Sequence, residues 1–198
     1  MKKIQQALIS VFDKTGLQEL VEVLSDHSIK IISSGGTAKY IQQIGHSVSD
    51  ISIYTGYPEM PGGLVKTLHP KIHGGILVDV DDPSQYEYIV KHSIIPIDIV
   101  IVNLYPFTEV MKKGNLKNTI QNIDIGGVTL LRAAAKSSLQ SGRVTVVSNI
   151  NQYKCIIQEI KKTGNISTNI KQKLIVDAFQ ITAEYEQTIS KYMNDKLL

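Results

Sequence analysis

Short apolar runs and helical periods alternate along the first 45 residues. The run at 7–11 is followed by apolar residues three and four positions apart, and the run at 30–34 is followed by a second such period that stops at Gly45. This spacing places the apolar side chains on one face of a helix, and Thr15 followed by Gln18 predicts a capping box at the first helix start. The order strand, helix, strand, helix favours a parallel sheet with right-handed crossovers.

The rest of the chain continues this order after one irregular segment. Residues 54–75 are rich in glycine and proline and have weak periodicity, which predicts a functional or mobile loop. The run within 96–107 is continuously apolar, as is typical of a central parallel strand covered on both faces. Further elements are predicted as strands at 75–78 and 143–148 and as helices at 84–93, 128–137, 151–163 and 168–193.

These elements predict one α/β domain, a three-layer sandwich built on a parallel sheet. We expect an α/β core over about residues 1–150 and C-terminal helices over 151–198, with the last helix as a packing arm. The chain has 198 residues, of which 42% are hydrophobic and 20% charged, and this composition is that of a globular protein with one buried core.

The composition also limits the location of the protein and the classes of partner that it can bind. No apolar run approaches the roughly 20 residues that cross a bilayer, and the apolar stretch near the start is too short for a signal peptide. Cys155 is the only cysteine, so no intrachain disulfide forms and a reducing cytoplasm is the expected location. The net charge of +3 lacks the dense basic stripe of a nucleic-acid binder. We therefore expect a cytoplasmic protein that binds neither nucleic acid nor membranes.

Polar clusters follow the predicted strands, at the edge where an open parallel sheet binds its ligands. These clusters are Asp13-Lys14-Thr15, Ser34-Gly35-Gly36-Thr37, Asn103-Leu104-Tyr105 and, before a helix, Asp124 with Gly126-Gly127. The SGGT segment suits a phosphate, because glycines let an anion approach the backbone and the next helix presents free N–H groups. A purely structural Gly-Gly turn remains open. Neither a Walker A loop nor a full G-x-G-x-x-G fingerprint is present, so we expect neither an ATPase nor an NAD enzyme.

The stretch GGLVKTLHPKIHGG at 62–75 suits either half of a metal site or an anion loop. His69 and His73 are four residues apart, but a metal site needs a third ligand. We expect no metal here and assign both histidines to structural or substrate hydrogen bonds. Lys66, Asp124 and Lys136 are ordinary ion-pair candidates singly, but together at one cleft they indicate acid–base chemistry on a phosphorylated small molecule.

Five motifs, in chain order, carry a family resemblance. They are DKTGL (13–17), SGGTAK (34–39), VKTLHPKIHGGIL (65–77), NLYPF (103–107) and IDIGGVTLLRAAAK (123–136). These motifs resemble the inosine monophosphate (IMP) cyclohydrolase domain, the methylglyoxal-synthase-like N-terminal part of the bifunctional purine biosynthesis protein that also carries a formyltransferase. The resemblance implies a homodimer that closes the ring of 5-formamidoimidazole-4-carboxamide ribonucleotide (FAICAR) to give IMP and water, without a metal or organic cofactor.

The resemblance also implies which residues form the site. The phosphate would lie at the SGGT segment, and the base would lie at the end of the central strand. The residues implied to bind the substrate are Asp13, Lys14, Ser34, Gly35, Gly36, Thr37, Val65, Thr67, Val102, Asn103, Ile125 and Gly126. The residues implied to act in catalysis are Lys66, Tyr105, Asp124 and Lys136, with Lys136 as the proton donor or acceptor.

Two positions depart from the family pattern. Leu64 stands where the family usually has an arginine, and Phe12 stands where it usually has a serine, so one cation and one hydroxyl are missing. Lys71 is the candidate to compensate for the cation. Two alternatives therefore stay open: a non-catalytic purine-nucleotide-binding or scaffold domain with a decayed site, and a methylglyoxal-synthase-like lyase. No stretch resembles the transformylase half, and the sequence leaves open whether the natural chain continues.

Overall fold

The structure is a computed structural model that describes residues 3–113 and 115–198. Five strands form one sheet in the order β3-β2-β1-β4-β5, and every neighbouring pair is parallel. The strands are β1 (Gln6–Val11), β2 (Lys30–Ser33), β3 (Ser49–Asp50), β4 (Ile99–Asn103) and β5 (Thr145–Val147). In the central strand β1, Leu8 pairs with Ile32 on one side and with Val100 on the other. Leu8 is fully buried, as expected of a strand covered on both faces.

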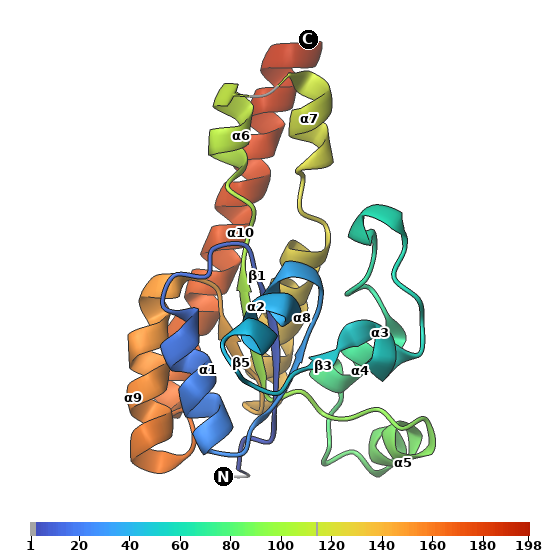
Figure 1. Cartoon of the computed structure of the whole chain (residues 1–198), viewed down its shortest axis with the longest axis vertical. Coiled ribbons are helices and arrows are strands. Elements are labelled where there is room, and N and C mark those ends of the chain that lie inside the picture. The colour runs from blue at the N-terminus through green and yellow to red at the C-terminus, as the bar shows by residue number, and fades with distance from the viewer. Residues whose placement is uncertain (1–2, 114) are drawn as a thin grey trace.

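Helices cover both faces of this sheet, which confirms the predicted three-layer α/β fold. The longer helices are α1 (Leu17–Asp26), α2 (Gly35–Gln43), α4 (Pro70–Leu77), α5 (Pro83–Lys91), α8 (Gly126–Ser141), α9 (Tyr153–Thr163) and α10 (Thr168–Leu197). Three short helical elements lie between them: α3 (Ile51–Thr55), η1 (Pro61–Gly63) and η2 (Ile150–Gln152). α1 packs against α9, and α4 and α10 both pack against α8. Figure 1 shows α1 and α9 on one side of the sheet and α4 and α8 on the other.

A helical arm rises beyond the carboxyl edge of the sheet (Figure 1). It consists of α6 (Phe107–Lys113), α7 (Leu116–Gln121) and the second half of α10. The Phe107 ring packs edge-on against Tyr185 and Tyr192, with ring centroids 6.1 and 5.7 Å away. The first half of α10 packs instead into the main core through Leu174 and Ala178. One long helix therefore joins the arm to the sandwich, and this arm encloses one side of the carboxyl edge.

Two local predictions are wrong. Residues 75–77 belong to α4 rather than to a strand, because His69 caps that helix and Ile72 and Ile76 continue its buried face. An added Cβ at Gly75 would lie 2.5 Å from a backbone oxygen, so the glycine allows a close approach of the next segment. The capping box at α1 is also absent. The cap is Gly16 in a left-handed conformation, with φ of 72° and no side-chain cap.

A buried cation fixes the C-terminal end of α4. The Arg143 guanidinium donates to the carbonyls of Gly75, Ile76 and Val78 at 3.0, 2.8 and 3.3 Å. It also pairs with Asp98 at 3.3 Å, and its side chain is only 11% exposed. The last carbonyls of a helix have no partner within the helix. Here the guanidinium joins the Ile97 N–H at the Gly75 carbonyl and the Ser137 hydroxyl at the Ile76 carbonyl. α4 is thereby fixed at one end, while its other end reaches the site described next.

Candidate functional site

The site lies at the topological switch point of the sheet. β1 and β4 are neighbours, and their last residues Val11 and Asn103 are paired. The chain leaves β1 toward β2 and leaves β4 toward β5, in opposite directions along the sheet. Open α/β sheets bind their ligands in the crevice formed at such a point. Here a cavity of about 390 Å³, called the main cavity below, is lined by these strand ends, the start of α2, residues 62–68 and residues 121–127.

One amide side chain joins the ends of the two strands. Asn103 Oδ1 accepts the backbone N–H groups of Phe12 and Asp13 at 2.7 and 2.9 Å, and Asn103 Nδ2 donates to the Asp13 carbonyl at 2.8 Å. Lys14 Nζ in turn donates to the Phe12 carbonyl at 3.2 Å. The Asn103 side chain, expected to address the base, is thus engaged in holding the turn at residues 12–13.

The second part of the site is an anion cradle at the start of α2. Ser34 is the N-cap residue, yet its side chain makes no cap hydrogen bond. This side chain is only 7% exposed, and its Oγ has no hydrogen-bond partner within the described residues. An added Cβ at Gly35 would lie 2.7 Å from Lys66 Nζ, so the glycine lets the ammonium approach the turn. Free N–H groups, an unpaired hydroxyl and a cation together suit a phosphate.

Thr37, expected to bind the phosphate, also bonds to the end of β1. Its Oγ1 donates to the Val11 carbonyl at 3.0 Å and accepts the Val11 N–H at 3.2 Å. The hydroxyl therefore helps to hold α2 against the end of β1. Thr37 lines the main cavity, but it positions the cradle.

A half-buried carboxylate, that of Asp124, also lines the main cavity. Burial raises the pKa of Asp124 above its ordinary value, and hydrogen bonds from the Gly127 and Tyr105 backbones, with the charge of Lys66, oppose that rise. The Gly127 N–H donates to Asp124 Oδ1 at 2.7 Å, and the Asp124 N–H donates to the Tyr185 hydroxyl at 2.8 Å. A carboxylate with a raised pKa is a candidate for proton transfer.

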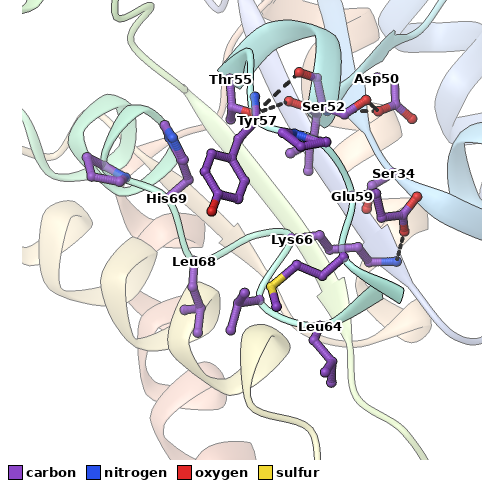
Figure 2. Close-up of a pocket in the computed structure, with 15 residues that line it drawn as sticks. Ser34, Asp50, Ser52, Thr55, Tyr57, Glu59, Leu64, Lys66, Leu68 and His69 are labelled. Atoms are coloured by element: carbon purple, nitrogen blue, oxygen red, sulfur yellow. Dashed lines mark hydrogen bonds and ion pairs between the residues drawn. The ribbon is translucent and has the colours of Figure 1, made fainter. Parts of the chain in front are cut away.

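Residues 56–69, called the strap below, carry Lys66 and form one wall of the main cavity. Behind the strap lies a second cavity of about 370 Å³, drawn in Figure 2. Lys66 and Ser34 line both cavities, and Lys66 Nζ lies 3.8 Å from Glu59 Oε1, as the dashed line in Figure 2 shows. Val65, just before Lys66, has a φ of 49°, which is uncommon for a β-branched residue. The predicted loop at 54–75 is thus a strap followed by the helix α4.

The two histidines support the strap. His69 Nδ1 accepts the Lys71 N–H at 3.1 Å and so caps α4. Burial lowers the pKa of His73, while a hydrogen bond with the Thr67 backbone opposes the change. Within residues 3–113 and 115–198, no three His, Cys, Asp or Glu side chains converge as a metal site requires. Lys71 Nζ lies 3.4 Å from the Tyr54 carbonyl and does not line the main cavity, so it does not replace the missing arginine.

Most of the predicted site residues meet in the main cavity. Those that line it are Lys14, Ser34, Gly36, Thr37, Val65, Lys66, Thr67, Asn103, Tyr105, Asp124, Ile125 and Gly126. Gly35 contacts Lys66 but does not line the cavity, and the Val102 side chain is buried in β4. Asp13 lines the neighbouring groove, where the Thr15 N–H lowers the pKa of its carboxyl.

Lys136 does not line the main cavity. It lies ten residues after Gly126 on α8, about 15 Å along the helix axis. Its side chain is exposed, and its Nζ donates to Gln140 Oε1 at 3.3 Å. Sequence reasoning also missed Gln121 and Asn122, which line the cavity from a segment where no element was expected.

Comparisons with known proteins agree with this architecture. The model of the MGS-like domain matches residues 16–129, and that of the AICARFT/IMPCHase bienzyme matches residues 134–197. The chain is 44% identical, over 193 residues, to the bifunctional purine biosynthesis protein PurH of Persephonella marina (strain DSM 14350 / EX-H1). This match covers 97% of the chain but only 37% of that relative's length.

A solved structure matches the whole fold. The crystal structure of ForH superposes with a TM-score of 0.82 at 25% identity, over 96% of this chain and 97% of that one. Among the described residues, no helix is both long and apolar enough to cross a membrane. The resemblance carried by the five motifs is confirmed, and the chain belongs to the family of MGS-like domains that occur in AICARFT/IMPCHase bienzymes.

Proposed function

We propose that the chain is an IMP cyclohydrolase, which closes the ring of FAICAR to IMP with loss of water at the last step of purine biosynthesis. One observation carries the proposal: a phosphate cradle and a carboxylate with a raised pKa share one cavity at the switch point. The likeness to PurH supports the substrate class, a purine ribonucleotide. The homodimer and the cytoplasmic location stay predictions.

The reaction is intramolecular and needs mainly alignment. The carboxamide nitrogen attacks the formyl carbon, and a new C–N bond forms. One proton leaves the carboxamide nitrogen and one leaves the formamido nitrogen, and both depart with the formyl oxygen as water. No electrons are exchanged with a second compound, so the step requires no redox partner. Holding the two groups in contact supplies much of the rate, because an aligned intramolecular step avoids the entropy of encounter.

The residues of the main cavity suit these steps. The cradle of Ser34 and Lys66 would anchor the 5′-phosphate at one end. Asp124 would accept the proton from the carboxamide nitrogen and return it to the leaving oxygen. A carboxyl group with a raised pKa suits both the uptake and the release of this proton. Tyr105 would stabilise the negative charge that develops on the formyl oxygen, while the Lys66 ammonium stays with the phosphate. The proton transfer expected of Lys136 stays a prediction, because its ammonium faces Gln140.

The direct test is to mix the purified chain with FAICAR and to follow the absorbance of IMP. We expect IMP to appear with the wild type and its formation to be nearly lost in Asp124→Asn and Lys66→Met. A wild-type chain that is folded, as judged by circular dichroism, but forms no IMP would contradict the proposal.

A second candidate is a non-catalytic purine-nucleotide-binding or scaffold domain. The exposed side chain of Leu64, 61% accessible where the family has an arginine, and the position of Lys136 favour it. This candidate predicts IMP binding without turnover. If the site has decayed, the wild-type rate of IMP formation is negligible and Leu64→Arg raises it. One charge-assisted hydrogen bond is worth about tenfold or more in rate. An active wild type whose rate rises by less than that in Leu64→Arg would argue against a decayed site.

A further inference from the structure

Two half-exposed aromatic rings form part of the wall of the main cavity. Phe12 and Tyr105 are 47% and 45% exposed, and their ring centroids lie 4.7 Å apart with the planes tilted by 43°. They are the only aromatic residues among the described residues that line this cavity. Aromatic side chains of this size usually bury most of their surface, so an exposed pair in a cavity wall suggests a contact with a ligand.

The pair is held in place by the backbone. The Phe12 N–H donates to Asn103 Oδ1 at 2.7 Å, and the Tyr105 carbonyl accepts the Phe107 N–H at 2.8 Å. Phe12 follows β1 and Tyr105 follows β4, so the two rings extend from the paired ends of neighbouring strands. A surface that is already ordered costs little entropy when a ligand binds to it.

The pair also lies at a suitable place relative to the anion cradle. Both the cradle residue Ser34 and the two rings line the main cavity. Lys14 lines it too, and its Nζ donates to the Phe12 carbonyl. A ligand with its phosphate at the start of α2 can therefore reach the rings with its other end. Planar heterocycles stack on aromatic side chains whatever their hydrogen-bonding pattern, because every base has a π face.

We propose that Phe12, together with Tyr105, forms a stacking platform for the planar heterocycle of the nucleotide, and that Phe12 sets the affinity for it. The platform rests on the proposed function in one respect, that the ligand is a purine ribonucleotide. Phe12 stands where the family usually has a serine, so the ring face takes the place of a hydroxyl. Phe12 is then a specificity residue of this chain and not a mark of decay.

The test compares two ligands by isothermal titration calorimetry: IMP, which has the heterocycle, and ribose 5-phosphate, which lacks it. Stacking on an aromatic residue is worth about five- to 150-fold in affinity. We expect Phe12→Leu to weaken IMP binding by a factor in this range and to leave ribose 5-phosphate binding unchanged. Phe12→Tyr, which keeps a ring, should restore most of the lost affinity. Phe12→Ser provides a second ringless variant if Phe12→Leu folds poorly.

Tyr88 provides a matched control away from the site. It is 58% exposed on α5, and its ring lies 4.3 Å from that of His92. Tyr88→Leu should leave IMP affinity at the wild-type value. If Phe12→Leu binds IMP as tightly as the wild type, or weakens both ligands equally, the platform is refuted.

The platform and the proposed reaction fail in different ways. A wild type that forms IMP, with Phe12→Leu unchanged in IMP affinity, would refute the platform and keep the reaction. A wild type that binds IMP in a Phe12-dependent manner but forms no IMP from FAICAR would refute the reaction and keep the platform. Binding of neither ligand would refute both.

Discussion

Ser34→Ala should strengthen the fold and weaken ligand binding. The Ser34 hydroxyl is buried without a partner in the described part of the chain, and it does not cap α2. An unpaired buried polar group costs about 1–3 kcal/mol, so removing it should raise the free energy of unfolding by at least about 1 kcal/mol. For a domain of this size that corresponds to a rise of about 2–4 °C in Tm.

The effect of the same change on binding has the opposite sign. A hydrogen bond from a hydroxyl to a charged phosphate is worth about 1.5–3 kcal/mol. Losing it should weaken the binding of IMP and of ribose 5-phosphate by about ten- to hundredfold. Thermal unfolding followed by circular dichroism gives the first quantity, and calorimetric titration gives the second.

Thr37→Val is the matched control. The Thr37 hydroxyl is also buried at the start of α2, but it is paired twice with the Val11 backbone. Its removal should lower the free energy of unfolding by about 1–3 kcal/mol, because the Val11 groups lose a partner. A Ser34→Ala variant that melts at a lower temperature than the wild type, with unchanged phosphate affinity, would refute the assignment of Ser34 to the cradle.

Three further changes test other parts of the structure. Arg143→Met should lower the free energy of unfolding in urea by about 3–5 kcal/mol, since it removes the cation that pairs with the largely buried Asp98 carboxylate. Lys161→Ala, at an exposed pair 3.9 Å from Glu19, should change it by less than about 0.5 kcal/mol. Because the pKa of Asp124 is raised in the folded state, ionisation of its carboxyl opposes folding at pH values above its ordinary pKa of 3.8. Asp124→Asn should therefore raise Tm at pH 7. This gain in Tm should disappear as the pH falls toward 3.8. The wild-type rate of IMP formation should fall on the acid side with an apparent pKa above 3.8. Lys136→Ala should keep the wild-type IMP affinity in calorimetry, because its ammonium lies outside the main cavity, and a large loss would show that Lys136 reaches the ligand.

Local patterns predicted four of the five strands, all but the two-residue β3, and the edge of the sheet where the candidate site lies. The strands β1 and β4 are continuous apolar runs, and the polar residues that follow them meet because parallel strands end at one edge. The run at 75–78 misled for a physical reason: a short apolar run has the same appearance in a strand and in a buried helix segment. The arm helices were missed because Phe107 is buried by Tyr185 and Tyr192, which lie far along the chain.

Individual side chains of the site were less predictable. The motif places Lys136 near the site, but ten residues of helix rotate it to another face than Gly126. A helical projection would have shown this, since Arg132, Lys136 and Gln140 recur every four residues and form an exposed polar face. The occupation of Asn103 by the turn at residues 12–13 could not be predicted, because it depends on backbone geometry that no local pattern encodes.

The hydrogen bonds between the Asn103 side chain and the turn at residues 12–13 also have a consequence for how the chain folds. They join groups that are about 90 residues apart in sequence, so they form only after a loop of that length has closed. Contacts of such high sequence separation form late and slowly. The turn that carries Phe12 is therefore fixed by hydrogen bonds only after β4 has paired with β1. A nascent or partly refolded chain would lack this wall of the cavity, so ligand binding would report on completion of the sheet and not on collapse of the core.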